Sequence, residues 1–266
     1  MLNLFKSDLK RIYKDTLFKV AIIVGLGFAL FMPLTYFGMS ALIGEDIVNA
    51  KTIFFSSMIP SSNFTLIAPI FIIIAICKDF SQGTVRNKII SGNSRAKIFF
   101  SMFFTCFFYM FAIILAHALI TLFVSLIFFD YQLGAFDGAA LGYLLLSILF
   151  EMIVYFFISA IASFLCVFAK NAGLSVVLYI AVVFGFSLIG SIIQIAYSVM
   201  LSLETTGTAV EILEFLTNTN PFLTALIGSS SSYSFTDVLY ITIPPILFGS
   251  LFLLLGSLVF KKKDLK

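Results

Sequence analysis

The feature that most constrains the fold is a series of long runs with at most one charged residue. A helix crosses the hydrocarbon core of a bilayer with about 20 apolar residues. Six runs reach that length, and they predict an all-α membrane protein with six transmembrane helices in one domain, residues 1–266. The runs are residues 20–44 (its helix ending near Met39), 52–77 (its helix starting near Pro60), 98–129, 139–169, 171–203 and 238–260.

Composition excludes a soluble alternative. Asp, Glu, Lys and Arg make up 11% of the chain and 61% of it is hydrophobic, whereas soluble domains carry about 25% charged residues. The net charge of +3 gives no indication of nucleic-acid binding. The positions of the charges are more informative than their sum.

Basic residues predict the orientation. With six spans, fifteen of the sixteen Lys and Arg fall on one side of the membrane and only Lys51 on the other. The positive-inside rule then places both termini in the cytoplasm, for a multi-pass protein of the cell membrane.

The first 19 residues predict an amphipathic helix that lies on the inner membrane surface. Apolar residues share one face, and Lys and Asp lie opposite: the apolar set is Leu2, Phe5, Leu9, Ile12 and Tyr13. A plain basic anchor is the alternative interpretation.

Small residues recur at spacing four in two spans, as Ala21, Gly25 and Ala29 in the first and Ala181 and Gly185 in the fifth. Such ladders let helices approach closely, and they are candidates for an interface with a second copy.

His117 and Glu151 are the ionisable groups deep within spans. They are nearly symmetric about Gly134, so an antiparallel hairpin should place them at similar depth. Buried ionisable residues in membranes are candidates for translocation sites. The alternative is a structural role, either as a pair or with Glu151 bonded to Ser or Tyr of a neighbouring helix.

Residues 203–237 form the largest expected external segment. Val210, Leu213 and Leu216 alternate with Glu211 and Glu214 in a helical pattern that predicts a short external helix before the sixth span, broken by residues 218–221. Residues 228–234 read as a flexible turn.

Residues 78–96 form the most polar loop between two spans. Within it, Thr84–Ile90 reads as a short amphipathic helix, in which Val85 and Ile89 share a face. Gly92 is placed to end that helix and Ser94 to cap the next. The loop is either an ordinary basic connection or a helix that docks on a soluble partner.

Motifs for catalysis are missing from the sequence. It contains no G-x-x-x-x-G-K-[ST], no nucleophile triad and no cluster with metal-ligand spacing. We therefore expect no enzyme activity, metal or nucleotide on this chain, and energy for transport from another subunit.

The loop resembles the exporter-type (type 2) ABC transporter permease family. That family's pattern is an acid, three residues, Gly-Thr, a short helix and then Ser-Arg leading into the third span. Here the acid is Asp79, the Gly-Thr is Gly83-Thr84 and the Ser-Arg is Ser94-Arg95. The family more often has Glu at the acid, and the six-span layout extends the resemblance over the whole chain.

This resemblance implies a transmembrane subunit whose loop helix couples to a separate ATPase that binds ATP and Mg. Two permeases, here a homodimer, would work with two such ATPases. The coupling helix would insert an apolar knob, formed by Val85, Ile89 and Ile90, into a groove of the ATPase. Its basic residues, Arg86, Lys88 and Arg95, would contact an acidic rim of that groove. The cargo would be an amphipathic or antimicrobial-type peptide, with lipid, drug or sodium export as alternatives.

Other classes stay open. A proton-coupled secondary transporter would use Glu151 and His117 as a relay, a membrane enzyme would turn over substrate alone, and an immunity scaffold would bind peptide without moving it. The 34 Phe are interpreted either as an apolar wall for a peptide or as lipid-facing filler.

Overall fold

A computed structural model describes residues 2–44, 48–59, 63–131, 138–203, 207–223 and 234–263, and these form helices and connections without a strand. Six helices are long and apolar enough to cross a membrane. They confirm the predicted all-α, six-span class: α2 (Thr16–Ile43), α4 (Asn63–Ser81), α6 (Arg95–Phe128), α7 (Gly138–Ala169), α8 (Ala172–Ser202) and α11 (Phe235–Lys262).

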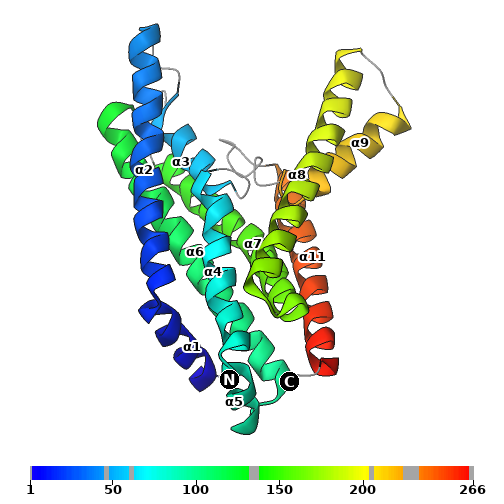
Figure 1. Ribbon diagram of the computed structural model, residues 1–266. Coiled ribbons are helices and arrows are strands. Elements are labelled where there is room, and N and C mark those ends of the chain that lie inside the picture. The colour runs from blue at the N-terminus through cyan, green and yellow to red at the C-terminus, as the bar shows by residue number, and fades with distance from the viewer. Residues whose placement is uncertain are drawn as a thin grey trace.

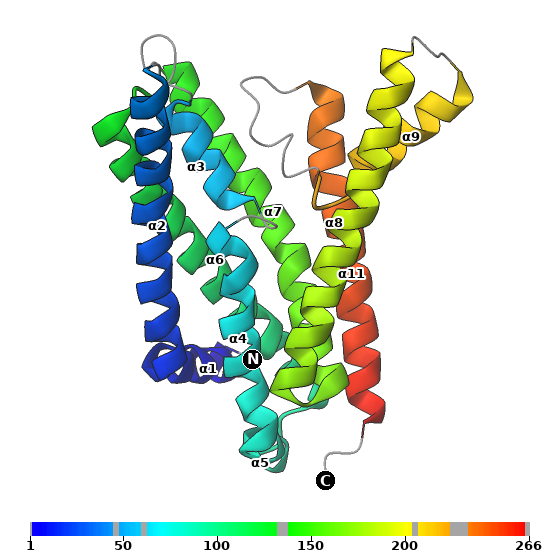
Figure 2. The same ribbon diagram turned by 45° about the horizontal axis from the view of Figure 1, so that its top comes forward.

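Four shorter helices lie at the two ends of this bundle: α1 (Leu2–Lys14), α3 (Ala50–Met58), α5 (Thr84–Ile90) and α9 (Thr208–Thr219). The chain ends and α5 share one end of the molecule, and α9 lies toward the other (Figure 1). Helix α1 runs across the spanning helices at a large angle to α2 (Figure 2). The α5 end therefore gathers elements from the start, middle and end of the sequence.

The second apolar run is split. Residues 60–62, with the predicted helix start at Pro60, lie outside the described residues. Helix α4 begins at Asn63, and α3 is a separate helix that the sequence interpretation missed. Its N-cap Asn49 accepts a hydrogen bond from the Thr52 N–H at 2.9 Å, and its face of Ile53, Phe54 and Met58 joins a core with Ala118 of α6.

The small-residue ladder of α2 is internal. Ala21 and Ala29 are fully buried, and a Cβ placed on Gly25 would lie 2.9 Å from the Phe64 ring of α4. The assignment of Ala21, Gly25 and Ala29 to a dimer interface is therefore wrong. The ladder lets α4 approach α2 within one chain.

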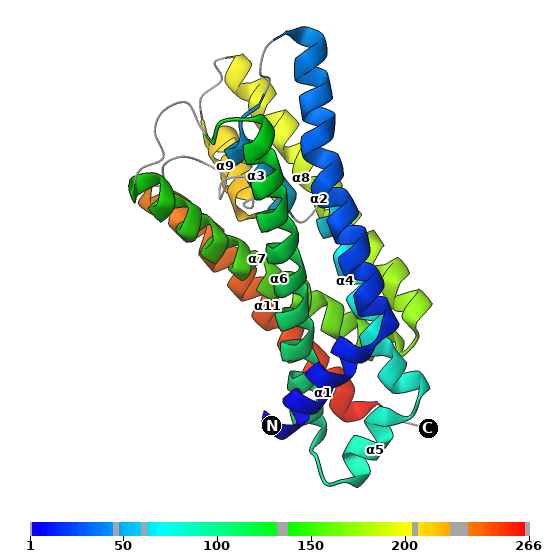
Figure 3. The same ribbon diagram turned by 90° about the vertical axis from the view of Figure 1, so that its left-hand side faces the viewer.

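Helices α7 and α11 lie side by side over most of their length (Figure 3). Gly249 allows this approach, since a Cβ there would lie 2.6 Å from the Phe156 ring. Phe157, also on α7, is fully buried among Phe186, Phe222 and Phe252. Much of the phenylalanine is thus core packing, a role that neither interpretation of the Phe content anticipated.

Two groups of helices diverge away from the α5 end. Helices α2, α3 and α6 lie on one side and α8, α9 and α11 on the other (Figure 2). Helix α9 confirms the short helix predicted before the sixth span, and it ends at Thr219 with Asn220 as its C-cap, inside the predicted break at 218–221. Its place outside the membrane stays a prediction. The predicted turn at 228–234 lies, up to residue 233, outside the described residues.

Candidate functional site

Helix α5 has the bounds that the sequence predicted, Thr84–Ile90. Gly83, its N-cap, has φ 69°, and Gly92 after it has φ 85°, a left-handed backbone that glycine adopts without a Cβ clash. Ser94 caps α6 and accepts from the Lys97 N–H at 3.4 Å. The predicted stop at Gly92 and cap at Ser94 are both confirmed.

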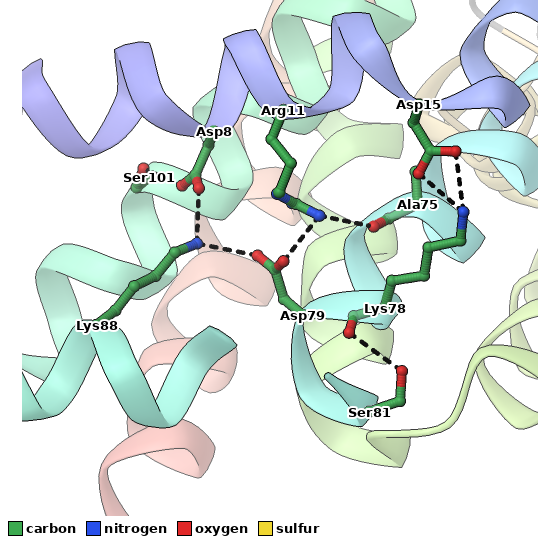
Figure 4. A network of polar contacts seen from close by, with 9 residues as sticks. All are labelled: Asp8, Arg11, Asp15, Ala75, Lys78, Asp79, Ser81, Lys88 and Ser101. Atoms are coloured by element: carbon green, nitrogen blue, oxygen red, sulfur yellow. Dashed lines mark hydrogen bonds and ion pairs between the residues drawn. The ribbon is translucent and has the colours of Figure 1, made fainter. Parts of the chain in front are cut away.

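A buried network of charges holds α5 against the rest of the molecule (Figure 4). The Lys88 Nζ of α5 lies 2.6 Å from Asp8 Oδ1 of α1 and 2.9 Å from Asp79 Oδ2 of α4. Arg11 Nη1 of α1 lies 2.8 Å from the other oxygen of Asp79. Asp8 and Asp79 are 3% and 1% exposed, so both carboxylates depend on these partners.

Neighbouring groups complete this network. Ser101 Oγ of α6 donates to Asp8 Oδ2 at 2.7 Å, and Arg11 Nη1 donates to the Ala75 carbonyl of α4 at 3.4 Å. Asp79 Oδ1 accepts no aligned hydrogen bond from the residues that the structure describes, so its contact with Arg11 is an ion pair by distance alone. Replacing a buried ion pair by apolar residues is often neutral, but removing one partner costs about 3–5 kcal/mol. The network therefore fixes α5 to α1, α4 and α6.

A second ion pair lies at the junction of α1 and α2. Lys78 Nζ lies 2.8 Å from Asp15 Oδ2, and Asp15 caps α2 by accepting from the Leu17 N–H at 3.0 Å. Burial acts to raise the pKa of Asp15, but the hydrogen bonds from Lys78 and Leu17 outweigh it and lower that pKa. The carboxylate is thereby held in its charged form.

The sequence interpretation did not find these partners. It placed Asp8 with the lysines on the polar face of the first helix, whereas Asp8 points inward. Spacing offered a signal: Asp8, Arg11 and Asp15 are three and four residues apart and share a face. The exposed Lys6, Lys10 and Lys14 form another row.

The exposed surface of α5 is narrower than predicted. Val85 is buried in the core, Ile89 is half-buried, and Lys88 is 8% exposed in the ion network. Arg86 and Asn87 are exposed and Ile90 is 74% exposed. The apolar knob of Val85, Ile89 and Ile90 is thus corrected to Ile90 with the edge of Ile89, because a short amphipathic helix turns its apolar face toward its own core.

Arg95 also has an internal role instead of the predicted free charge. Its Nη1 donates to the carbonyls of Phe260, Lys261 and Lys263 at 3.2, 2.9 and 2.7 Å. These carbonyls end α11 without partners in their own helix, and a cation there satisfies them. Arg95 thus ties the start of α6 to the end of α11.

Lys263 caps the end of another helix in the same way as Arg95. Its Nζ donates to the Val167 carbonyl at 2.9 Å and to the Phe168 carbonyl, at the end of α7. Burial, with the nearby charge of Lys170, lowers the pKa of Lys263. The ends of α6, α7 and α11 are therefore joined by two cations.

The structure does not join the two intramembrane candidates to each other. His117 Nδ1 lies 2.9 Å from the Gly25 carbonyl of α2, and its ring packs on Phe64. Glu151 is 3% exposed, and no hydrogen bond to its Oε2 is formed within the described ranges. Its neighbour one turn along α7, Tyr155, donates to the Met58 carbonyl at 2.6 Å. The proton relay from Glu151 to His117 thus has no direct link in this structure.

The small residues of α8 differ from those of α2. Ala181 is exposed and Gly185 is half-exposed, and both line a cavity of about 380 Å³ beside α9. Their assignment to an interface with a second copy stays a prediction. Over the ranges that the structure covers, no three His, Cys, Asp or Glu gather as metal ligands would.

These features define the class: a polytopic helical membrane protein with six spanning-length helices and a short, internally fixed helix at the end that also carries both chain ends. Residues 17–266 match the family described as Protein of unknown function (DUF2705), and the chain belongs to that family. No curated protein matches the chain.

Proposed function

We propose that this chain is the transmembrane subunit of an ATP-driven exporter of the type 2 ABC kind, in which α5 docks on a separate ATPase subunit. The observation that carries the proposal is the attachment of α5. A seven-residue helix lies at one end of the molecule, with Arg86, Asn87 and Ile90 outward and Lys88 fixed inward between Asp8 and Asp79. A docking helix needs such an outward face and such an anchor.

The ion pairs of Lys88 explain how a movement of α5 would be transmitted to the spanning helices. Lys88 connects α5 to α1 and α4, and Asp8 in turn accepts from Ser101 of α6. Breaking one of these contacts would leave a buried charge without its partner, which is energetically costly. A displacement of α5 should therefore move the attached helices with it. ATP and Mg would be bound by the partner, whose closure supplies the push.

The distribution of Lys and Arg supports a cytoplasmic location for the α5 end and for both termini, in the cell membrane. A second copy would complete the path, with the exposed face of α8, including Ala181 and Gly185, available to it. An amphipathic or antimicrobial-type peptide is the proposed cargo, and lipid, drug or sodium export by the same architecture is the alternative.

One observation favours a second candidate function. Glu151 is buried in a spanning helix, and among the described residues its Oε2 has no hydrogen-bond partner. Such groups mark proton or ion pathways. A proton-coupled transporter would lose transport on Glu151→Gln and would keep it without any ATPase.

Co-purification of the tagged chain from its own cells, in detergent, tests the docking. Wild type is compared with Arg86→Glu plus Ile90→Asp, which changes the exposed face of α5 and leaves the buried Val85 and Lys88 intact. Lys10→Glu, an exposed change on α1, is the control.

We expect a nucleotide-binding subunit, identified by mass spectrometry and by vanadate-sensitive ATP hydrolysis, with wild type and with Lys10→Glu. The α5 variant should lose it. Absence of that subunit from every sample, or its retention by the α5 variant, would refute docking through α5.

A further inference from the structure

An apolar cavity lies toward the end opposite α5, between α9 and α11 (Figure 1). These helices line a cavity of about 720 Å³, within the size range of ligand pockets. Its lining is almost wholly apolar and includes Phe215 of α9 and Ile243, Leu247, Phe248 and Leu251 of α11. Leu247 and Phe215 are 64% and 55% exposed, so the cavity is an open groove.

The groove has a direction. Along α11, Thr236 and Tyr240 line its outer part, and Ile243, Leu247 and Leu251 line it further in. Thr236 and Leu251 are fifteen positions apart along the helix, which is about 22 Å. A long molecule would lie with its apolar part toward the centre of the spans and its polar part at the outer rim.

The rim is acidic. Between Lys170 and Lys261 the sequence has no Lys, Arg or His, while it has four acids. Glu211 precedes Phe215 by one helical turn, and Glu214 is adjacent to it; both are exposed on α9. Asp237 lies one turn before Tyr240 on α11. Within the described segments no cation pairs with Glu211 or Glu214.

From this complementarity we infer that the groove between α9 and α11 binds a cationic amphipathic peptide, its apolar face on Leu247 and Phe248 and its cationic residues beside Glu211 and Glu214. An apolar groove alone would accept any acyl chain, but the acidic rim selects against anionic headgroups. The inference names the cargo class of the exporter and rests on that proposed function for its part in transport. Binding itself needs no ATPase.

The chain has no Trp, so one introduced Trp is an unambiguous reporter. Phe215→Trp places it in the groove. Phe31→Trp, on an exposed position of α2, is the matched control. Each variant is reconstituted in phosphatidylcholine nanodiscs and titrated with a dansyl-labelled Lys/Leu helical peptide, the corresponding Glu/Leu peptide and dansyl-phosphatidylethanolamine. Energy transfer from Trp to dansyl is measured.

We expect saturable transfer from Phe215→Trp to the Lys/Leu peptide, none to the Glu/Leu peptide, and only the nonsaturating background of the bilayer with Phe31→Trp. Adding Glu211→Gln and Glu214→Gln should weaken the binding about tenfold, since two partly exposed charge contacts are lost. Equal transfer to both peptides, unchanged affinity after the Glu→Gln changes, or saturation by the dansyl lipid would overturn the inference. No ATPase is present in this binding experiment. The peptide-binding inference can therefore be refuted while the docking proposal stands, and the docking proposal can be refuted while peptide binding stands.

Discussion

Lys88 and Asp8 are 80 residues apart in the sequence, and their side chains meet at 2.6 Å inside the protein. Lys88 comes from the loop whose helix is proposed to dock on an ATPase, and Asp8 from the helix that the sequence assigned to the membrane surface. Their contact makes α1 a structural support of α5.

We predict that Lys88→Met destabilises the protein by about 3 kcal/mol, because Asp8 and Asp79 are left buried with one cation fewer. Thermal unfolding in detergent measures the loss, and trypsin should cut faster after Arg86 in the variant. Lys97→Met, an exposed change, is the control. An Lys88→Met protein that unfolds with wild type would show that the network does not hold α5.

Gly25→Ala is expected to destabilise by about 1–3 kcal/mol. The new Cβ would lie 2.9 Å from the Phe64 ring, which is fully buried and packs on His117. At Gly27 the added Cβ of Gly27→Ala meets no described atom within 4 Å, so this variant should be neutral or stabilising, since Ala is the better helix former. Similar unfolding temperatures for both variants would contradict the tight packing of α2 on α4.

The pH dependence of Asp15 follows from its lowered pKa. A carboxyl whose pKa is lower folded than unfolded stabilises the protein above its unfolded pKa, ordinarily 3.8, and loses that contribution as the pH falls through the folded value. Asp15→Asn keeps a side-chain cap and removes the charge. It should cost less than about 1 kcal/mol at pH 7, since Lys78 is partly exposed, and progressively less below pH ~4.

Chemical unfolding of both proteins at pH 7 and pH 3 checks this expectation. Asp15→Ala serves as the second variant, and it should also lose the cap and remain destabilised at pH 3. A cost of Asp15→Asn that does not depend on pH would show that the charge contributes nothing.

Arg95→Ala should loosen the end of α11, because it leaves the carbonyls of Phe260, Lys261 and Lys263 without this donor. Hydrogen bonds to a charged group contribute about 1.5–3 kcal/mol, so we expect amide exchange in the last turn of α11 to rise at least tenfold. Hydrogen exchange followed by mass spectrometry measures it, with Lys97→Ala as control. Protection equal to wild type would rule out the capping role.

The amino-acid sequence by itself determined the features that depend on residues close together in the chain. The number of spanning-length helices, the helix Thr84–Ile90, the stop at Gly92, the cap at Ser94 and the helix over Val210 and Leu213 all follow from hydropathy, spacing and glycine chemistry within a few residues. The division of the apolar run 52–77 into α3 and α4 was harder to predict, because Pro60 is the main indication of a break in that run.

Tertiary structure alone decided which faces turn inward. Ala21, Gly25 and Ala29 have the same pattern whether they meet a second copy or Phe64, and only the packed chain shows Phe64 there. Likewise, nothing near Lys88 or Arg95 in sequence shows that their partners are Asp8 and the carbonyls of α11. A helix pattern is set by neighbours within one turn, whereas the partner of a side chain is set by elements far away in the sequence, such as the end of α11 for Arg95.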